Sequence, residues 1–465
     1  MGPMLRRVRC SFGRMTSRRL MSALPVVVAV ILPFAVAWSL LVVSQTRLGA
    51  DATAALRAQG QPDGQVVTFT AGRIDPGQAD IRPNEAAYVG SVSKTFTAAM
   101  TLRLVDRGVL RIDDPVVTHL PAFRVQGPRE ETEAITVRML LEQTSGIPTS
   151  AGIADLGERD HVQVSARERV ARLAQVPLVS EPGAEFHYAN SNYAVLGQVL
   201  AAATGSPYPE LLREEVITPL GLTRTNAAGE GYGRDVGCGR LAFFGAGLPL
   251  CLPHDPHGVA EGYLVSSPTD LATFVEALRT GPYLTPESRA LMLEPSGGRE
   301  YGAGLFREGD VVHHPGDVTI AHADVGVDVV TGRGTVVLVD QAGQLFDSSA
   351  PFRVSQFGEP VSDGGFRVVA LVMVGLAAVV ALFIAADVLI RRRRTWWSVV
   401  LRVVVAVGLP LGLFYAAGRG LGLAGLLPWP LAVAAAPDLL LILAVASIYL
   451  LGSAVVFGVS ARRVA

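Results

Sequence analysis

Hydrophobic positions give the chain two apolar ends and a mixed middle. The ends contain long, almost uncharged stretches, and about 20 consecutive apolar residues are enough to cross a bilayer as a helix. We therefore predict four transmembrane helices, at residues 21–43, 368–390, 399–417 and 439–459. Leu421–Ala436 is apolar but shorter and contains two prolines, so we interpret it as an interfacial or re-entrant loop.

The middle of the chain alternates between two periodicities. Alternating β-branched residues predict strands, at residues 65–71, 301–306, 318–330 and 334–340. Apolar residues at helical spacing predict helices, at residues 91–107, 135–142, 162–175, 192–204, 208–216 and 269–279. Residues 225–260 are rich in glycine and proline and are predicted to form a long loop. Strands at both ends with helices between them indicate an α+β fold, with one sheet assembled from distant segments and a helical lobe.

Charge sets the predicted orientation of the chain. Residues 1–43 contain six arginines and no acid, residues 44–366 contain 25 basic and 39 acidic residues, and residues 367–465 contain nine arginines and two aspartates. Basic clusters near membrane segments stay on the cytoplasmic side. We therefore expect a multi-pass protein of the cell membrane with both termini in the cytoplasm. The acidic middle argues against nucleic acid as a partner.

The predicted domains follow from this orientation. They are a cytoplasmic basic tail at 1–20, a signal anchor at 21–43, an extracytoplasmic domain at 44–366 and a membrane region at 367–465. Cleavage of the first apolar segment as a signal peptide is the lesser alternative. Cys238 and Cys251 both fall in the predicted exported domain. A disulfide between them and two free buried thiols are both compatible with the sequence.

Lys94 is the single lysine of the chain. Apart from the histidines, every other basic side chain is arginine, which cannot release its proton in a protein, whereas lysine can. Lys94 follows Ser91 by three residues at the predicted start of a helix, so hydroxyl and amine share one helix face. The helix N-terminus also offers free N–H groups to an oxyanion. This arrangement indicates an activated serine nucleophile, against the alternative that the lysine is a solvated surface charge.

Two further segments carry candidate chemistry. Tyr188 precedes a predicted helix, and its phenol could act as a general base if a cation lowered its pKa. The amide of Asn190 could orient a substrate carbonyl or the lysine. His314 and Gly316 stand just before a predicted strand, where glycine lets backbone and ligand approach closely. A metal site at His313 and His314 is the rival interpretation, but no Glu or Cys stands at ligand spacing. We expect neither a metal nor a cofactor.

Taken together, these segments resemble the serine beta-lactamase and penicillin-recognising hydrolase family, in its class C beta-lactamase-related branch. The matching segments are collinear over roughly residues 65–342. They are Gly90–Lys94 with Thr95-Phe96-Thr97, Leu110–Pro115 with Leu120-Pro121, Leu140–Pro148, Tyr188–Tyr193, Glu261–Leu271 and His314–Gly316. The last takes the place of the family's Lys-Thr-Gly element, as His-x-Gly does in many esterase-like members.

The resemblance implies a beta-lactamase/transpeptidase-like α+β fold with added transmembrane helices, and it implies roles for the candidate residues. Ser91 is the expected nucleophile. Lys94 and Tyr188 share the general-base work, and the sequence leaves open which of them holds the proton. Asn190 orients the lysine or the substrate. The backbone N–H groups of Ser91 and Asp317 form the expected oxyanion hole, where each donor typically contributes about 3 kcal/mol to the transition state.

The sequence departs from the family pattern at Gln143, Pro315 and Asp317. His314, Gly316 and Asp317 are expected to contact substrate, but Pro315 and Asp317 stand where beta-lactam-binding members have hydroxyl donors. A carboxylate there should repel the carboxylate of a penicillin. Gln143 stands where histidine is usual, at an expected structural position. We therefore expect an ester or a peptide-like amide as substrate, with weak or no beta-lactam hydrolysis.

Three functions compete at this point. The main prediction is a membrane-anchored extracytoplasmic serine hydrolase that acts through an acyl-enzyme. The alternative is a penicillin-binding or sensor protein, or a beta-lactamase, whose pocket signals or binds cell-wall peptide. A structural membrane protein with a decayed hydrolase domain is the third. The intact set of Ser91, Lys94 and Tyr188 favours the enzyme, since a pure binding module need not keep all three.

Overall fold

The computed structural model describes residues 64–78, 81–156, 163–230, 236–243, 246–342 and 447–448. Its strands are β1 (Gln65–Thr70), β2 (Arg73–Ile74), β3 (Ala87–Tyr88), β4 (Cys238–Phe243), β5 (Ala246–Cys251), β6 (Val265–Ser266), β7 (Phe306–Glu308), β8 (Val311–Val318), β9 (Ala321–Asp328), β10 (Arg333–Val339) and β11 (Gln341–Ala342). Its α-helices are α3 (Ser93–Asp106), α4 (Val116–His119), α5 (Arg129–Ala134), α6 (Val137–Leu141), α7 (Thr149–Leu156), α8 (Ala166–Arg172), α9 (Asn190–Thr204), α10 (Tyr208–Leu212), α11 (Thr218–Leu220), α12 (Pro268–Arg279) and α13 (Pro286–Leu293).

The main sheet joins the two ends of the described domain. Its order is β2-β1-β10-β9-β8-β7, and every pair in it is antiparallel. The first strand therefore lies beside β10, with Gln65 opposite Leu338. Valine and threonine, which favour pleated structure, occupy the three central pairs of these strands, from Val66–Val337 to Thr68–Thr335. This arrangement confirms the predicted α+β architecture with one sheet built from distant segments.

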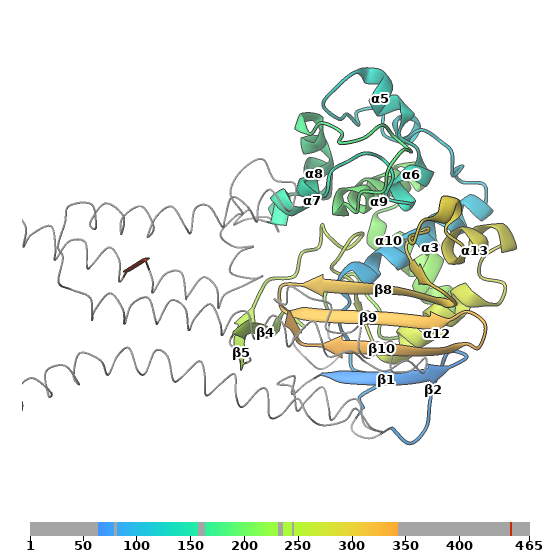
Figure 1. The fold of residues 1–465 in the computed structure, drawn as a ribbon, viewed down its shortest axis with the longest axis vertical. Helices are drawn as coiled ribbons and strands as arrows, with labels where there is room; N and C mark the ends of the chain where they lie inside the picture. Colours follow the sequence, from blue (N-terminus) through green and yellow to red (C-terminus); the bar gives the residue numbers. More distant parts are fainter. Residues whose placement is uncertain are drawn as a thin grey trace, which may run out of the picture.

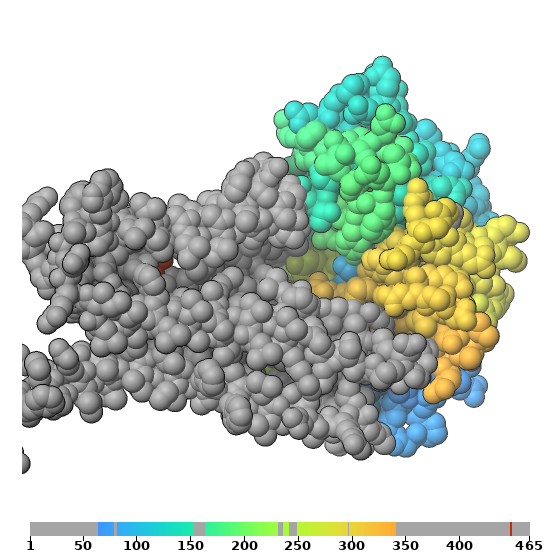
Figure 2. Space-filling model, viewed as in Figure 1, coloured from blue at the N-terminus to red at the C-terminus, as the bar shows by residue number. Residues whose placement is uncertain are grey.

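The helices form a lobe beside the sheet (Figure 1). Helices α5 to α9 make its outer part, α3 and α10 lie between that part and the sheet, and α12 packs on β9 and β10. The rings of Phe96 in α3 and Phe274 in α12 stack with centroids 3.8 Å apart, inside one hydrophobic core that continues through both lobes. Figure 2 shows the lobes in broad contact, the helical one in cyan and green against yellow and orange. This packing fixes α3 against the sheet.

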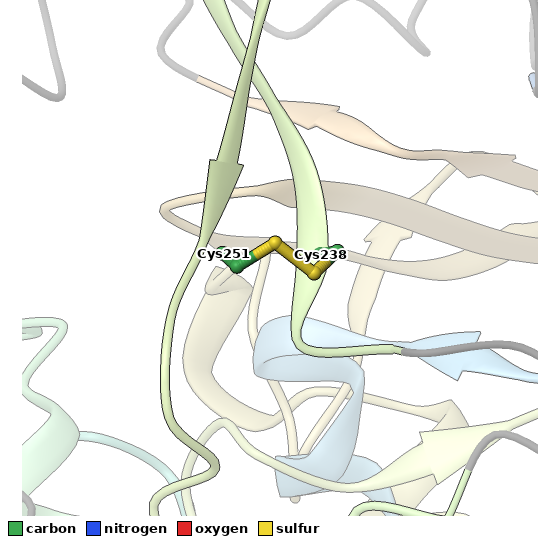
Figure 3. The surroundings of a disulfide bond; sticks show 2 residues. All are labelled: Cys238 and Cys251. Carbon is green, nitrogen blue, oxygen red and sulfur yellow. A yellow bond between two sulfur atoms is a disulfide. The ribbon is translucent and has the colours of Figure 1, made fainter.

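Residues 225–260 contain a hairpin that the sequence did not predict. Strands β4 and β5 pair in antiparallel register with Cys238 opposite Cys251, and these two cysteines form a disulfide (Figure 3). The hairpin is extended by β11, which runs parallel to β4. Of the two states left open by the sequence, the structure therefore shows the disulfide.

The strand predicted at 318–330 is also wrong in extent. The structure has two strands there, β8 and β9, and β8 begins at Val311. His313 and His314 consequently lie inside a strand and not before one. Pro315 fits in β8 because β7 pairs only with Val311, Val312 and His313, so β8 is an edge strand from His314 onward.

The prediction of added transmembrane helices is wrong for the part of the chain that the structure describes. No helix there is long and apolar enough to cross a bilayer. The longest, α9, has 15 residues, which is about 22 Å of helix against a hydrocarbon core of about 30 Å. The four predicted spans and the basic tail lie outside the described residues, except for two helical residues at 447–448.

Candidate active site

Ser91 and Lys94 lie where the chain turns from strand β3 into helix α3. Ser91 is in a single 3₁₀ turn, Gly90–Val92, and Lys94 is in the first turn of α3. The hydroxyl of Ser93 holds this turn, because it donates to Gly90 O at 2.7 Å and accepts from Leu264 N at 3.1 Å. The predicted helical start is confirmed, and the sequence spacing brings hydroxyl and amine onto one face.

The amine of Lys94 contacts the hydroxyl of Ser91 directly. Its Nζ atom donates to Ser91 Oγ at 2.9 Å and to the backbone oxygen of Glu261 at 2.6 Å. The lysine side chain is fully buried, and burial lowers its pKa to about 7, against an opposing effect of the Glu261 carboxylate. A neutral amine is therefore accessible near neutral pH, so Lys94 can accept the proton of Ser91.

Tyr188 shows the opposite electrostatic behaviour. Burial raises its pKa well above the usual range, the neighbouring Tyr301 adds to this, and a hydrogen bond with Ser91 works the other way. The Lys94 amine lies 5.2 Å from the centre of the Tyr188 ring. The phenol consequently stays protonated near neutral pH. These directions favour Lys94 as the proton acceptor and leave Tyr188 as a hydroxyl that can donate.

The backbone around Tyr188 is held by Gln143. The buried amide oxygen of Gln143 accepts from Ala189 N at 3.0 Å and from Asn192 Nδ2 at 2.6 Å, while its backbone oxygen accepts from His187 N at 2.8 Å. Gln143 thus binds the chain on both sides of the tyrosine. Gln143, which stands where the family usually has histidine, therefore holds the backbone next to Tyr188.

Asn190 is the first residue of α9. Among the described residues its side chain makes no hydrogen bond, and a Cβ placed on Gly152 would lie 2.8 Å from Asn190 Cβ. Its role in orienting the lysine or the substrate stays a prediction. The neighbouring Asn192 is the better anchored amide, since its Oδ1 accepts from Ser145 Oγ at 2.6 Å.

The backbone nitrogens of Ser91 and Asp317 lie close together. A Cβ on Gly316 would lie 2.6 Å from Ser91 N, and a Cβ on Gly90 would lie 2.4 Å from Asp317 N. Gly90 also has a φ of +52°, which glycine adopts without strain. The close approach of the two glycines therefore places both N–H groups beside the nucleophile, as an oxyanion hole needs.

His314 is buried beside the tyrosines of the site, and its contact with substrate stays a prediction. It is 1% exposed, its Nε2 lies 3.3 Å from the hydroxyl of Tyr301, and its ring centre is 6.2 Å from that of Tyr188. The histidine therefore supports the tyrosine cluster from within. Asp317, three residues later, has a 69% exposed side chain whose Oδ1 lies 2.8 Å from Nδ1 of the buried His322.

A buried charged network next to Lys94 was not predicted from the sequence. Glu261 Oε1 lies 3.8 Å from Arg169 Nη1, and Arg169 Nη2 donates to the fully buried Asp255 at 2.8 Å. Burial raises the pKa of Glu261 to about 7, while Arg169 and Lys94 lower it. Three segments far apart in sequence build this network, so no local pattern marks it. Within the described residues, no group of three or more His, Cys, Asp and Glu side chains could hold a metal ion.

Comparison with known proteins identifies the family of the chain. The family model named Beta-lactamase matches residues 54–356, which is more than half of the chain. The chain belongs to this family. Penicillin-binding protein 4 of Amycolatopsis lactamdurans is 35% identical over 133 residues, which cover 29% of the chain and 34% of that protein. Protein flp of Staphylococcus aureus (strain COL) is 32% identical over 148 residues, 31% of the chain and 28% of that protein.

Solved structures agree with this family and with the predicted beta-lactamase/transpeptidase-like fold. A D-stereospecific amidohydrolase from Streptomyces has a TM-score of 0.53 at 27% identity, covering 62% of the chain and 92% of that structure. The octameric penicillin-binding protein homologue from Pyrococcus abyssi has a TM-score of 0.51, also at 27% identity, over 60% of the chain and 69% of that structure. The chain spans 28% to 54% of the lengths of the first curated relatives that it matches.

Proposed function

We propose that the protein is a serine hydrolase that cleaves an ester or a peptide-like amide through an acyl-enzyme. The proposal rests on the 2.9 Å hydrogen bond between Ser91 Oγ and the amine of Lys94. This amine is buried and has a pKa of about 7. Such a pair is a nucleophile with its own base. Similarity to a D-stereospecific amidohydrolase supports amides as a substrate class.

The proposed reaction has two halves. Neutral Lys94 takes the hydroxyl proton as Ser91 Oγ attacks the substrate carbonyl, and the N–H groups of Ser91 and Asp317 stabilise the oxyanion. Protonated Lys94 then delivers a proton to the leaving group through the Tyr188 hydroxyl, and the C–O or C–N bond breaks. In the second half, water attacks the acyl-Ser91 ester while Lys94 removes its proton. The bond between the acyl carbon and Ser91 Oγ then breaks, the acid leaves, and the proton returns from Lys94 to Ser91.

Beta-lactams are poor substrates in this proposal. The exposed carboxylate of Asp317 lies beside the oxyanion hole, where it repels the carboxylate that penicillins and cephalosporins carry. Efficient turnover of nitrocefin by the native chain would contradict this expectation.

The test uses covalent labelling of the full chain. Native protein and Ser91→Ala are exposed separately to a fluorophosphonate and to a fluorescent penicillin, and intact mass is read over time. A phosphonate adduct that is absent from the variant, without a penicillin adduct, supports the proposal. A long-lived penicillin adduct on Ser91 favours the penicillin-binding or sensor function. No adduct from either reagent on protein with a native melting curve rejects Ser91 as the nucleophile.

A further inference from the structure

The carboxylate of Asp317 is held in one direction although it is open to solvent. Its side chain is 69% exposed, and Oδ1 lies 2.8 Å from Nδ1 of His322. The two residues stand directly opposite each other on β8 and β9, so their side chains share one face of the sheet. His322 is buried. A buried imidazole thus orients an exposed carboxylate at the end of an edge strand.

The backbone of Asp317 stands beside the nucleophile, so its side chain starts at the edge of the site. Its own backbone N–H is one of the two proposed oxyanion donors, and a Cβ on Gly90, the residue before Ser91, would lie 2.4 Å from that nitrogen. The charge of Asp317 also acts on the phenol of Tyr188. Burial is the main cause of the raised pKa of Tyr188, and Tyr301 and Asp317 add to it.

The charge of Asp317 has no strong counter-charge in the described part of the chain. No described lysine or arginine forms an ion pair with it, and His322 is its single ion-pair partner there, through Oδ1. Lys94, the one lysine of the chain, is engaged by Ser91 and by the backbone of Glu261. Oδ2 of Asp317 makes no hydrogen bond to any described residue. One oxygen of an exposed carboxylate, on a residue whose backbone lies beside the nucleophile, is therefore available to a ligand.

We propose that Asp317 is the binding group for a cationic substituent of the substrate, an ammonium or a guanidinium carried close to the scissile carbonyl. The inference rests on the proposed function, because it assigns the substrate class of the same site. A cation near Oδ2 is attracted to the carboxylate, and an anion at that place is repelled. One charge would thus select basic esters or amides and reject acidic ones.

The experiment compares phosphonothioates that differ in a single charge. One probe carries 2-(trimethylammonio)ethanethiol as leaving group, and its neutral isostere carries 3,3-dimethylbutanethiol. A second pair places the same difference on the alkyl group of phosphorus. In each reaction Ser91 Oγ forms the O–P bond, the P–S bond breaks, Lys94 takes the hydroxyl proton, and the thiolate leaves. The rate constant of Ser91 phosphonylation is measured by intact mass on the full chain.

Asp317→Asn keeps the shape and an oxygen acceptor for His322 but removes the charge. Asp310→Asn is the matched control: its side chain is 67% exposed, against 69% for Asp317, and it precedes the opposite end of β8. We expect the cationic-to-neutral rate ratio of at least one pair to be about tenfold higher in the native chain than in Asp317→Asn, equivalent to about 1.4 kcal/mol. The ratio in Asp310→Asn should equal that of the native chain.

The outcomes separate this inference from the function on which it rests. Phosphonylation of Ser91 with the same cationic-to-neutral rate ratio in the native chain and in Asp317→Asn, for both pairs, overturns the cationic subsite and leaves the hydrolase proposal standing. Absence of phosphonylation by all four probes, on protein with a native melting curve, overturns the nucleophile assignment and the subsite with it.

Discussion

The backbone of Gly316 lies against the backbone of Gly90 with no room for a methyl group between them. A Cβ on Gly316 would lie 2.1 Å from Val89 O and 2.6 Å from Ser91 N. Both contacts are with main-chain atoms, which cannot rotate away as a side chain can. The spacing of the two proposed oxyanion donors therefore depends on this glycine pair.

Gly316→Ala should lower the rate of Ser91 phosphonylation by about 100-fold, because loss of one oxyanion donor costs about 10² to 10³ in rate. Gly262→Ala is the control, since a Cβ there meets nothing within 4 Å. A stopped assay with the neutral phosphonothioate gives the rates, and a melting curve reports folding. Equal rates for Gly316→Ala and the native chain would remove Asp317 N from the oxyanion hole.

The pKa of Lys94 sets a pH dependence. Because burial lowers it to about 7, the neutral base is present above that pH and is lost as the pH falls through it. We expect the phosphonylation rate to rise about tenfold per pH unit below pH 7 and to level off above. Lys94→Arg cannot supply a neutral base, so its rate should fall at least 100-fold at pH 8. A flat native profile between pH 5 and 8 would contradict the assignment.

Glu261 should shift the pH dependence of the phosphonylation rate. Its negative charge raises the pKa of Lys94 against the larger effect of burial, so removing the charge lowers the pKa further. Glu261→Gln keeps the backbone oxygen that accepts from Nζ and should move the acidic limb of the profile to lower pH. Glu215→Gln removes another buried glutamate, one paired with Arg103 and Arg107. That control should lower the melting temperature without moving the limb; a limb that moves equally in both variants would count against a direct effect of Glu261.

Gln143 should matter for the placement of Tyr188. Gln143→Ala leaves the buried Ala189 N–H and Asn192 amide without their acceptor, and each unsatisfied buried donor costs about 1 to 3 kcal/mol. We expect a lower melting temperature and slower phosphonylation, whereas Gln143→Glu, which keeps an oxygen acceptor, should recover part of both. Unchanged rates in Gln143→Ala would show that Tyr188 keeps its position without this contact.

The disulfide between Cys238 and Cys251 should contribute to stability alone. The two cysteines are 13 residues apart in sequence, so the disulfide closes a short loop. In the chain-entropy model, a disulfide that closes a loop of about 15 residues stabilises the folded state by about 3 kcal/mol. The double variant Cys238→Ala, Cys251→Ala should melt several degrees lower and keep the native phosphonylation rate at 25 °C. A fall in that rate, measured below the melting transition, would place the hairpin in the function of the site.

The sequence predicted the local features of the site well and the tertiary ones poorly. The pairing of Ser91 with Lys94 follows from helical spacing alone, so a sequence suffices. Whether Lys94 or Tyr188 holds the proton depends on burial, which only the packed structure supplies. The charge of Glu261 next to the lysine was missed for the same reason, since Lys94 and Arg169 both reach it from distant segments.

The errors in the fold have a common physical cause. His313 to Gly316 contains proline and glycine, which normally oppose a strand, but an unpaired edge tolerates them. The β4–β5 hairpin likewise runs through a glycine-rich and proline-containing sequence, and there pairing and a disulfide override local preference. Edge position and cross-linking are properties of the assembled sheet, so neither is visible in the order of residues.

The pairing of β1 with β10 also governs when the domain can be completed during synthesis. Gln65 and Leu338 are partners in register although 273 residues separate them. At about 5 to 20 residues per second, a ribosome needs about 14 to 55 s to make that stretch. The helices between them contact one another, as α6, α7 and α8 do with α9, so they can pack within that time. The nascent β1 must wait with an unsatisfied edge until the last strands emerge, which makes the interval before β10 the period of greatest exposure to misassembly and to chaperones.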